Sequence, residues 1–83
     1  MSKLPSISGN QLIKLLSQDG WIIKRKAKHG LSMYKEFRNK KQVTIIPNKN
    51  DDLPKGTLSD ILGPKQTNIG RKGLEKLINK YGL

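Results

Sequence analysis

Residues 20–46 read GWIIKRKAKHGLSMYKEFRNKKQVTII, and their pattern sets the expected architecture of the chain. Short polar turns divide it into three segments rich in β-branched and aromatic side chains, which we place at 21–27, 31–37 and 42–46. The first turn is Lys28-His29-Gly30, the second covers 38–41, and Pro47 ends the last segment. The pattern predicts three antiparallel strands that are joined by hairpins.

A helix is expected before these strands. Ser8 and Gln11 have the spacing of a capping box, and apolar residues follow at helical intervals, which predicts a helix over 9–19. Gly20 then stands where a helix usually needs a left-handed C-terminal cap. The chain should therefore pass from this helix directly into the first strand.

Two further helices are expected after the strands. Residues 48–55 have the composition of a loop, and the segment from Thr57 resembles a helix start. Leu58, Ile61 and Leu62 share one face of this helix, which should end at Gly63-Pro64. After a loop over 65–70, a last amphipathic helix begins at Arg71 and carries Leu74, Leu77, Ile78 and Tyr81 at helical spacing.

The expected fold class is α+β, in the order helix, three-stranded antiparallel sheet, helix, with an added C-terminal helix. The simplest architecture packs the helices on one face of the sheet. A chain of 83 residues buries too little apolar surface to divide its core, so residues 1–83 are expected to form a single domain.

Charge is the strongest signal in the composition. The chain has 17 Lys and Arg against 6 Asp and Glu, a formal net charge of +11. Nucleic acid is the commonest partner for such a chain, because each cation that meets a phosphate releases condensed counterions. An anionic membrane surface is the rival, but no helix combines a wide apolar face with a Lys-rich one. Without an apolar spanning run or a leader, the expected location is the cytoplasm.

Eight of the basic residues fall between positions 24 and 41, within the predicted strands. They form either a solvated sheet face or a platform for phosphates. Like charges on adjacent strands repel one another unless an anion lies across them, which favours the platform.

His29 is the sole histidine and lies inside this basic run. Neighbouring cations favour the neutral imidazole, the form that can remove a proton from an RNA 2′-hydroxyl. The alternative is an idle surface histidine. The chain has no cysteine nucleophile and no metal-ligand cluster, and Asp51 and Asp52 suit a loop better than a metal site, so neither a metal nor another cofactor is expected.

Some other side chains have two interpretations. Ser32 and Thr57 are candidate phosphate ligands, although Thr57 is as readily a helix cap. Trp21 and Tyr34 are candidates for base stacking, although burial in the core is the better interpretation of Trp21.

The chain resembles the HicA (YcfA-like) mRNA interferase toxins. The resemblance rests on a helix followed by Gly20-Trp21, Arg25 in a basic strand, a histidine in a tight turn, Tyr34, and Lys55-Gly56-Thr57-Leu58 leading into Ile61-Leu62. It implies a fold like a double-stranded RNA-binding domain and a type II toxin whose metal-independent endoribonuclease activity cleaves mRNA and blocks translation. It also implies neutralisation by a HicB-like antitoxin protein. The family's catalytic histidine follows Gly-Ser between the first two strands, and His29, preceded here by Ala27-Lys28, takes that place.

These residues suit two functions. In the first, His29 is the general base of an RNA-cleaving enzyme, and the RNA-binding residues are Arg25, Lys26, Lys28, Ser32, Lys35 and Lys55. In the second, the same sheet and the helix start at 70–72 grip double-stranded RNA without cutting it. A pure binding module does not need His29, so that residue discriminates between the two.

Overall fold

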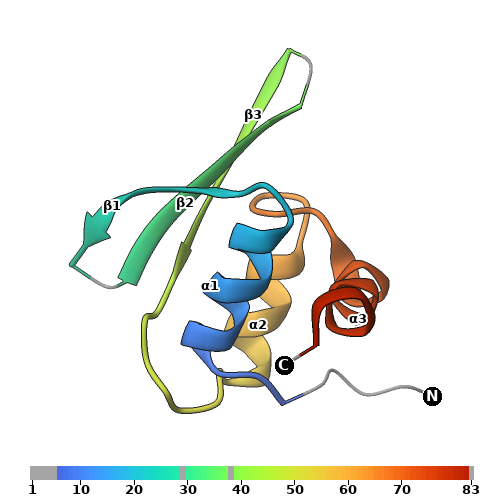
Figure 1. The fold of residues 1–83 in the computed structure, drawn as a ribbon. Coiled ribbons are helices and arrows are strands. Elements are labelled where there is room, and N and C mark those ends of the chain that lie inside the picture. The colour runs from blue at the N-terminus through green and yellow to red at the C-terminus, as the bar shows by residue number, and fades with distance from the viewer. Residues whose placement is uncertain (1–5, 29, 38, 83) are drawn as a thin grey trace.

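The computed structural model describes residues 6–28, 30–37 and 39–82, and its α+β fold confirms the predicted class. The elements follow in the predicted order (Figure 1): α1 (Gly9–Gln18), β1 (Ile22–Ala27), β2 (Gly30–Phe37), β3 (Lys40–Ile46), α2 (Lys55–Leu62) and α3 (Gly70–Tyr81).

Both ends of α1 are capped as the sequence indicates. The Gln11 amide donates to the Ser8 hydroxyl at 3.1 Å, and the Ser8 amide donates to the Gln11 side chain at 3.0 Å. At the other end Gly20 has φ +100°, and the amides of Gly20 and Trp21 donate to the carbonyls of Ser17 and Leu16. This pair of bonds closes the helix and turns the chain toward the sheet.

The sheet has the antiparallel order β1-β2-β3, with β2 in the centre. Its strands differ in extent from the prediction. Gly30 was placed in a turn but begins β2, where it pairs with Ala27. Lys40 and Lys41 were also placed in a turn but pair with Phe37 and Glu36 in β3, because an edge strand accepts polar side chains that point to solvent. The β2–β3 end extends beyond the helices (Figure 1).

A bulge in β1 changes which way its side chains point. Ile23 pairs with Met33, but the register then shifts and Arg25 pairs with Ser32. Without the bulge, Ile23 and Arg25 would lie on one face, because side chains alternate along a strand. With the bulge they lie on opposite faces.

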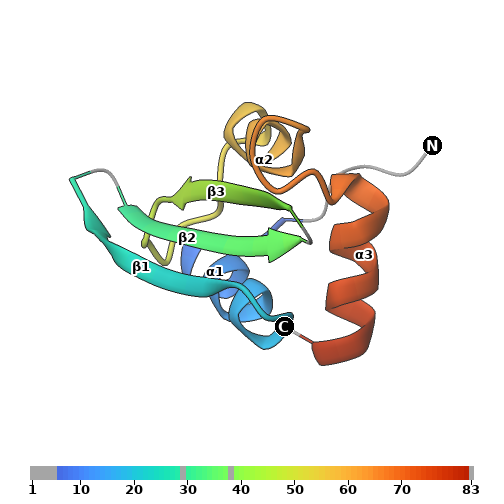
Figure 2. The same ribbon diagram turned by 90° about the horizontal axis from the view of Figure 1, so that it is seen from above.

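Helices cover one face of the sheet only (Figures 1 and 2). Met33 of β2 and Ile46 of β3 point into this layer and are fully buried. Trp21 precedes β1 rather than opening it, and is buried as expected. The predicted apolar faces of α2 and α3 are confirmed by the burial of Leu58, Ile61, Leu62, Leu74 and Leu77, and α3 packs against both α1 and α2.

The prediction was wrong about the start of α2. The helix begins at Lys55, two residues before Thr57, and no side chain caps it at Pro54. The Leu58 amide donates to the Pro54 carbonyl at 2.9 Å, so Pro54 accepts the first bond of the helix and Thr57 lies inside its first turn. Proline fits this boundary because it has no amide hydrogen to satisfy. Helix α3 likewise begins one residue early, at Gly70.

Candidate nucleic-acid interface

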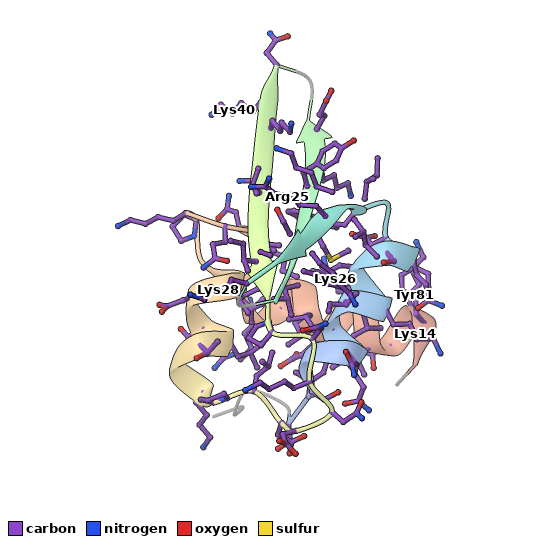
Figure 3. The ribbon with its side chains drawn as sticks, turned by 90° about the vertical axis from the view of Figure 1, so that its left-hand side faces the viewer. Lys14, Arg25, Lys26, Lys28, Lys40 and Tyr81 are labelled. Atoms are coloured by element: carbon purple, nitrogen blue, oxygen red, sulfur yellow. The ribbon has the colours of Figure 1, made fainter. Side chains whose placement is uncertain are left out.

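Strand β1 and the residue after it carry a ridge of cations along an edge of the sheet. Lys24, Arg25, Lys26 and Lys28 are all exposed, and we call these four residues the basic ridge. β1 is an outer strand of the sheet, so polar groups can reach the ridge from the open face and from the edge. Figure 3 shows Arg25 and Lys26 on β1 and Lys28 just past its end, with Lys14 on the helix α1.

The ridge projects toward both sides of the sheet. Arg25 pairs with Ser32 on the open face, whereas Lys26 pairs with Leu31 and points to the other side. Ser32 itself is buried, with 7% of its surface exposed. A nucleic-acid backbone that lies along the outer edge of β1 can therefore be reached by cations from both sides of the sheet.

His29 lies outside the described residues. Its chain neighbours are placed: Lys28 follows the end of β1, and Gly30 begins β2. Ala27 pairs with Gly30, so only positions 28 and 29 join the two strands. The assignment of His29 as the general base stays a prediction from the sequence.

Lys35 points away from the open face. Its ammonium donates to the Asp19 backbone carbonyl at 2.9 Å and lies 3.5 Å from the Asp19 carboxylate. A cation at the C-terminal end of a helix stabilises the helix dipole, so this contact ties the end of α1 to β2. The structure does not bring Lys35 together with Arg25, which lies on the opposite face of the sheet.

The remaining candidates are spread over other elements. Lys55 is exposed and begins α2, a different element from the strand that carries most of the basic ridge. Thr57 lies within α2 and is half-buried. Tyr34 is half-buried on the open face, and the Lys41 ammonium lies 4.6 Å from the centre of its ring.

One group of surface residues was missed from the sequence. Ile22, Val43 and Ile45 are 52%, 40% and 47% exposed, and all three lie on the open face. The signal that could have found Val43 and Ile45 is the segment 43–46, which reads VTII and places β-branched side chains on both faces of β3. A strand with only one covered face usually alternates apolar with polar residues.

Neither a metal centre nor a membrane span emerges from residues 6–28, 30–37 and 39–82. Over these ranges no three His, Cys, Asp or Glu side chains gather as metal ligands would. None of the helices described here has both the length and the apolar character needed to cross a bilayer.

One comparison with known proteins gives a match. The family model described as "HicA toxin of bacterial toxin-antitoxin" matches residues 9–69, from the start of α1 to the residue before α3. No curated protein matches the chain, and no solved structure does.

Proposed function

The chain belongs to the HicA toxin family, and we propose that it is a metal-independent endoribonuclease that cleaves mRNA and thereby inhibits translation. It acts in the cytoplasm and is held inactive by a HicB-like antitoxin protein. The observation that carries the proposal is the family match over residues 9–69, which spans the sheet together with α1 and α2.

The basic ridge is the proposed contact with the RNA backbone. Its four side chains are exposed, three on the edge strand β1 and Lys28 just after it, so they can meet phosphates without any rearrangement of the core. Each phosphate that they neutralise releases counterions, which gives affinity without sequence preference. Arg25, Lys26 and Lys28 make these contacts, and exposed Lys55 is an additional ligand, whereas Ser32, with 7% of its surface exposed, can offer little to a phosphate.

Lys35 has a supporting role in this proposal. Its ammonium is held by Asp19 at the end of α1, so it positions β2 against the helix rather than binding phosphate. This narrows the set of RNA-binding cations expected from the sequence to those of β1, its turn and α2.

His29 is the proposed general base. It takes the proton of an RNA 2′-hydroxyl, the oxygen attacks the adjacent phosphorus, and the bond from phosphorus to the 5′-oxygen breaks. The leaving 5′-oxygen takes a proton from water or from a protonated side chain, and one product ends in a 2′,3′-cyclic phosphate. Lys26 or Lys28, the flanking cations in the sequence, stabilises the negative charge that develops on the phosphate.

The test is a cleavage assay with the purified full chain and an mRNA, run in excess EDTA. Cut fragments with cyclic phosphate ends are expected, together with growth arrest when the chain is expressed and recovery when the neighbouring antitoxin gene is expressed with it. RNA that is bound tightly but stays intact would contradict the enzyme and would favour the double-stranded RNA-binding module.

A further inference from the structure

The open face of the sheet carries an apolar patch. Tyr34 of the central strand pairs with Ile22 on one side and with Val43 on the other, and Ile45 lies two residues beyond Val43. Directly paired residues lie on the same face with neighbouring side chains. These four residues therefore form one continuous surface across three strands, which we call the open-face patch.

The fold does not need the open-face patch to be apolar. The side chains of the sheet that enter the core come from the opposite face, where Met33, Thr44 and Ile46 are buried against the helices. No helix among the described residues covers the open face, which lies in front of the helices in Figure 3. A single exposed isoleucine is ordinary, but a contiguous apolar set on a monomer's surface marks an interaction site.

A hollow adjoins the open-face patch at its β3 side. It has a volume of about 310 Å³ and is lined by Val43, Thr44, Ile45 and Gln66. The Thr44 hydroxyl and the Gln66 side-chain oxygen are 2.6 Å apart and hydrogen-bonded, which fixes one wall. An apolar side chain of a partner can enter here beside Val43 and Ile45.

The rim of the open-face patch is cationic. Arg25 lies beside it, opposite Ser32, and the Lys41 ammonium lies over the Tyr34 ring. Glu36, which pairs with Lys41, is the acidic residue on this part of the sheet. The surface that fits is one with apolar side chains at its centre and carboxylates at its edge.

The apolar centre and cationic rim of the open-face patch distinguish among three possible partners: a second copy of the chain, RNA and an acidic protein. A second copy would bring the same cationic rim and a net charge of +11 against its own kind, so self-association is opposed. RNA bases stack on aromatic rings, but Ile22, Val43 and Ile45 are aliphatic, and the Lys41 ammonium already lies over the Tyr34 ring. An acidic protein partner satisfies both the apolar centre and the rim.

We propose that the open-face patch is the docking surface for the antitoxin, which covers Ile22, Val43 and Ile45 with apolar side chains and places carboxylates against Arg25 and Lys41. This inference rests on the proposed function, because the antitoxin is the partner named there and the inference adds the surface to which it binds. Arg25 belongs to the basic ridge as well as to the rim. The bound antitoxin therefore occupies Arg25 and prevents its contact with an RNA phosphate, so antitoxin and RNA compete for the chain.

The experiment measures binding of the product of the neighbouring gene to the full chain by calorimetry. The test variants are Ile45→Gln and the double variant Val43→Gln with Ile45→Gln. The matched control is Ile23→Gln, because Ile23 is 49% exposed, close to the 47% of Ile45, but pairs with Met33 and so points to the other face. All of these side chains are exposed, so thermal unfolding should stay close to that of the parent.

Covering a half-exposed isoleucine removes about half of its apolar area from water, which corresponds to roughly a fivefold loss of affinity on substitution. We expect about that loss for Ile45→Gln, roughly tenfold or more for the double variant, and less than about twofold for Ile23→Gln. Equal affinity of the double variant and the parent would overturn the inference, as would a parent chain that does not bind the neighbouring product.

Cleavage of RNA by the same proteins separates this inference from the proposed function. The double variant is expected to cut RNA at the parent's rate, because its substitutions lie outside the basic ridge. If the parent cuts RNA and the double variant keeps full antitoxin affinity, the docking surface is wrong and the ribonuclease stands. If the double variant instead loses affinity for RNA, the open face belongs to RNA and the inference is wrong. If the parent cuts no RNA, the proposed function fails.

Discussion

Substituting Gly9 by alanine tests the contact that holds α1 against the end of the sheet. Glycine inside a helix normally costs about 0.5–1 kcal/mol relative to alanine, so the ordinary expectation is stabilisation. Here a Cβ at position 9 would collide with the Pro47 carbonyl oxygen, and would stand 2.8 Å from its carbon and 3.3 Å from the Lys49 nitrogen. All three are backbone atoms, so no side chain can move aside.

The loss of stability in Gly9→Ala depends on how far the segment after β3 must move to make room for the new Cβ. Moving the segment after β3 away from α1 strains packing by about 1–3 kcal/mol. It also lengthens the bond from the Asn10 amide to the Lys49 carbonyl, which is 3.0 Å long and contributes about 1 kcal/mol. After the gain in helix propensity is subtracted, we expect Gly9→Ala to lower the free energy of unfolding by about 2 kcal/mol. For a domain of this size, that lowers Tm by roughly 8–16 °C.

Gly56→Ala is the matched control for this substitution. Gly56 also lies in the first turn of a helix, α2, but a Cβ there meets nothing within 4 Å. Its substitution should raise Tm by roughly 2–4 °C, from about 0.5 kcal/mol of helix propensity. Thermal melts followed by circular dichroism give both values. A Gly9→Ala variant as stable as Gly56→Ala would refute the close approach of α1 to Pro47.

Three further outcomes are expected. Leu74→Ala should cost about 2–5 kcal/mol in a denaturant titration, because Leu74 is fully buried; an unchanged midpoint would show that α3, outside the family match, is not part of the core. Lys35→Met should lower stability by about 1 kcal/mol and leave RNA affinity close to that of the parent, because its ammonium is held by Asp19; a large loss of RNA affinity with unchanged stability would return Lys35 to the RNA interface. Lys26→Met should weaken binding to all RNA sequences alike and reduce the slope of log affinity against log salt by about 0.7–0.9. The exposed Lys76 on α3 is the control, and Lys76→Met should change neither quantity. Equal slopes for the two variants would argue against the basic ridge as the RNA contact.

Local signals in the sequence were enough for α1 and for the order of elements. Ser8, Gln11 and Gly20 act on backbone groups within a few residues of themselves, so their spacing alone predicts both caps of α1. The start of α2 was misplaced for the opposite reason. Thr57 has the chemistry of a cap, but the first bond of the helix runs from the Leu58 amide to the Pro54 carbonyl, which places Thr57 inside the first turn.

The candidate site was only half visible in the sequence. The number and spacing of basic residues in a sequence do not depend on the fold, so the basic run at 24–41 could be recognised without a structure. The directions of its side chains could not, because the bulge after Ile23 reverses the alternation and places Arg25 on the open face. The contact between Lys35 and Asp19 joins residues sixteen apart in the chain and depends on how α1 meets β2.

Whether the chain is an RNA-cleaving toxin with His29 as its general base is best tested by the rate at which His29→Ala cleaves RNA. Single-turnover cleavage of a labelled mRNA, in excess EDTA, should slow by roughly a hundredfold to ten-thousandfold, while the Kd for uncut RNA stays within about twofold of the parent's. A His29→Ala protein that cuts RNA as fast as the parent would contradict the claim.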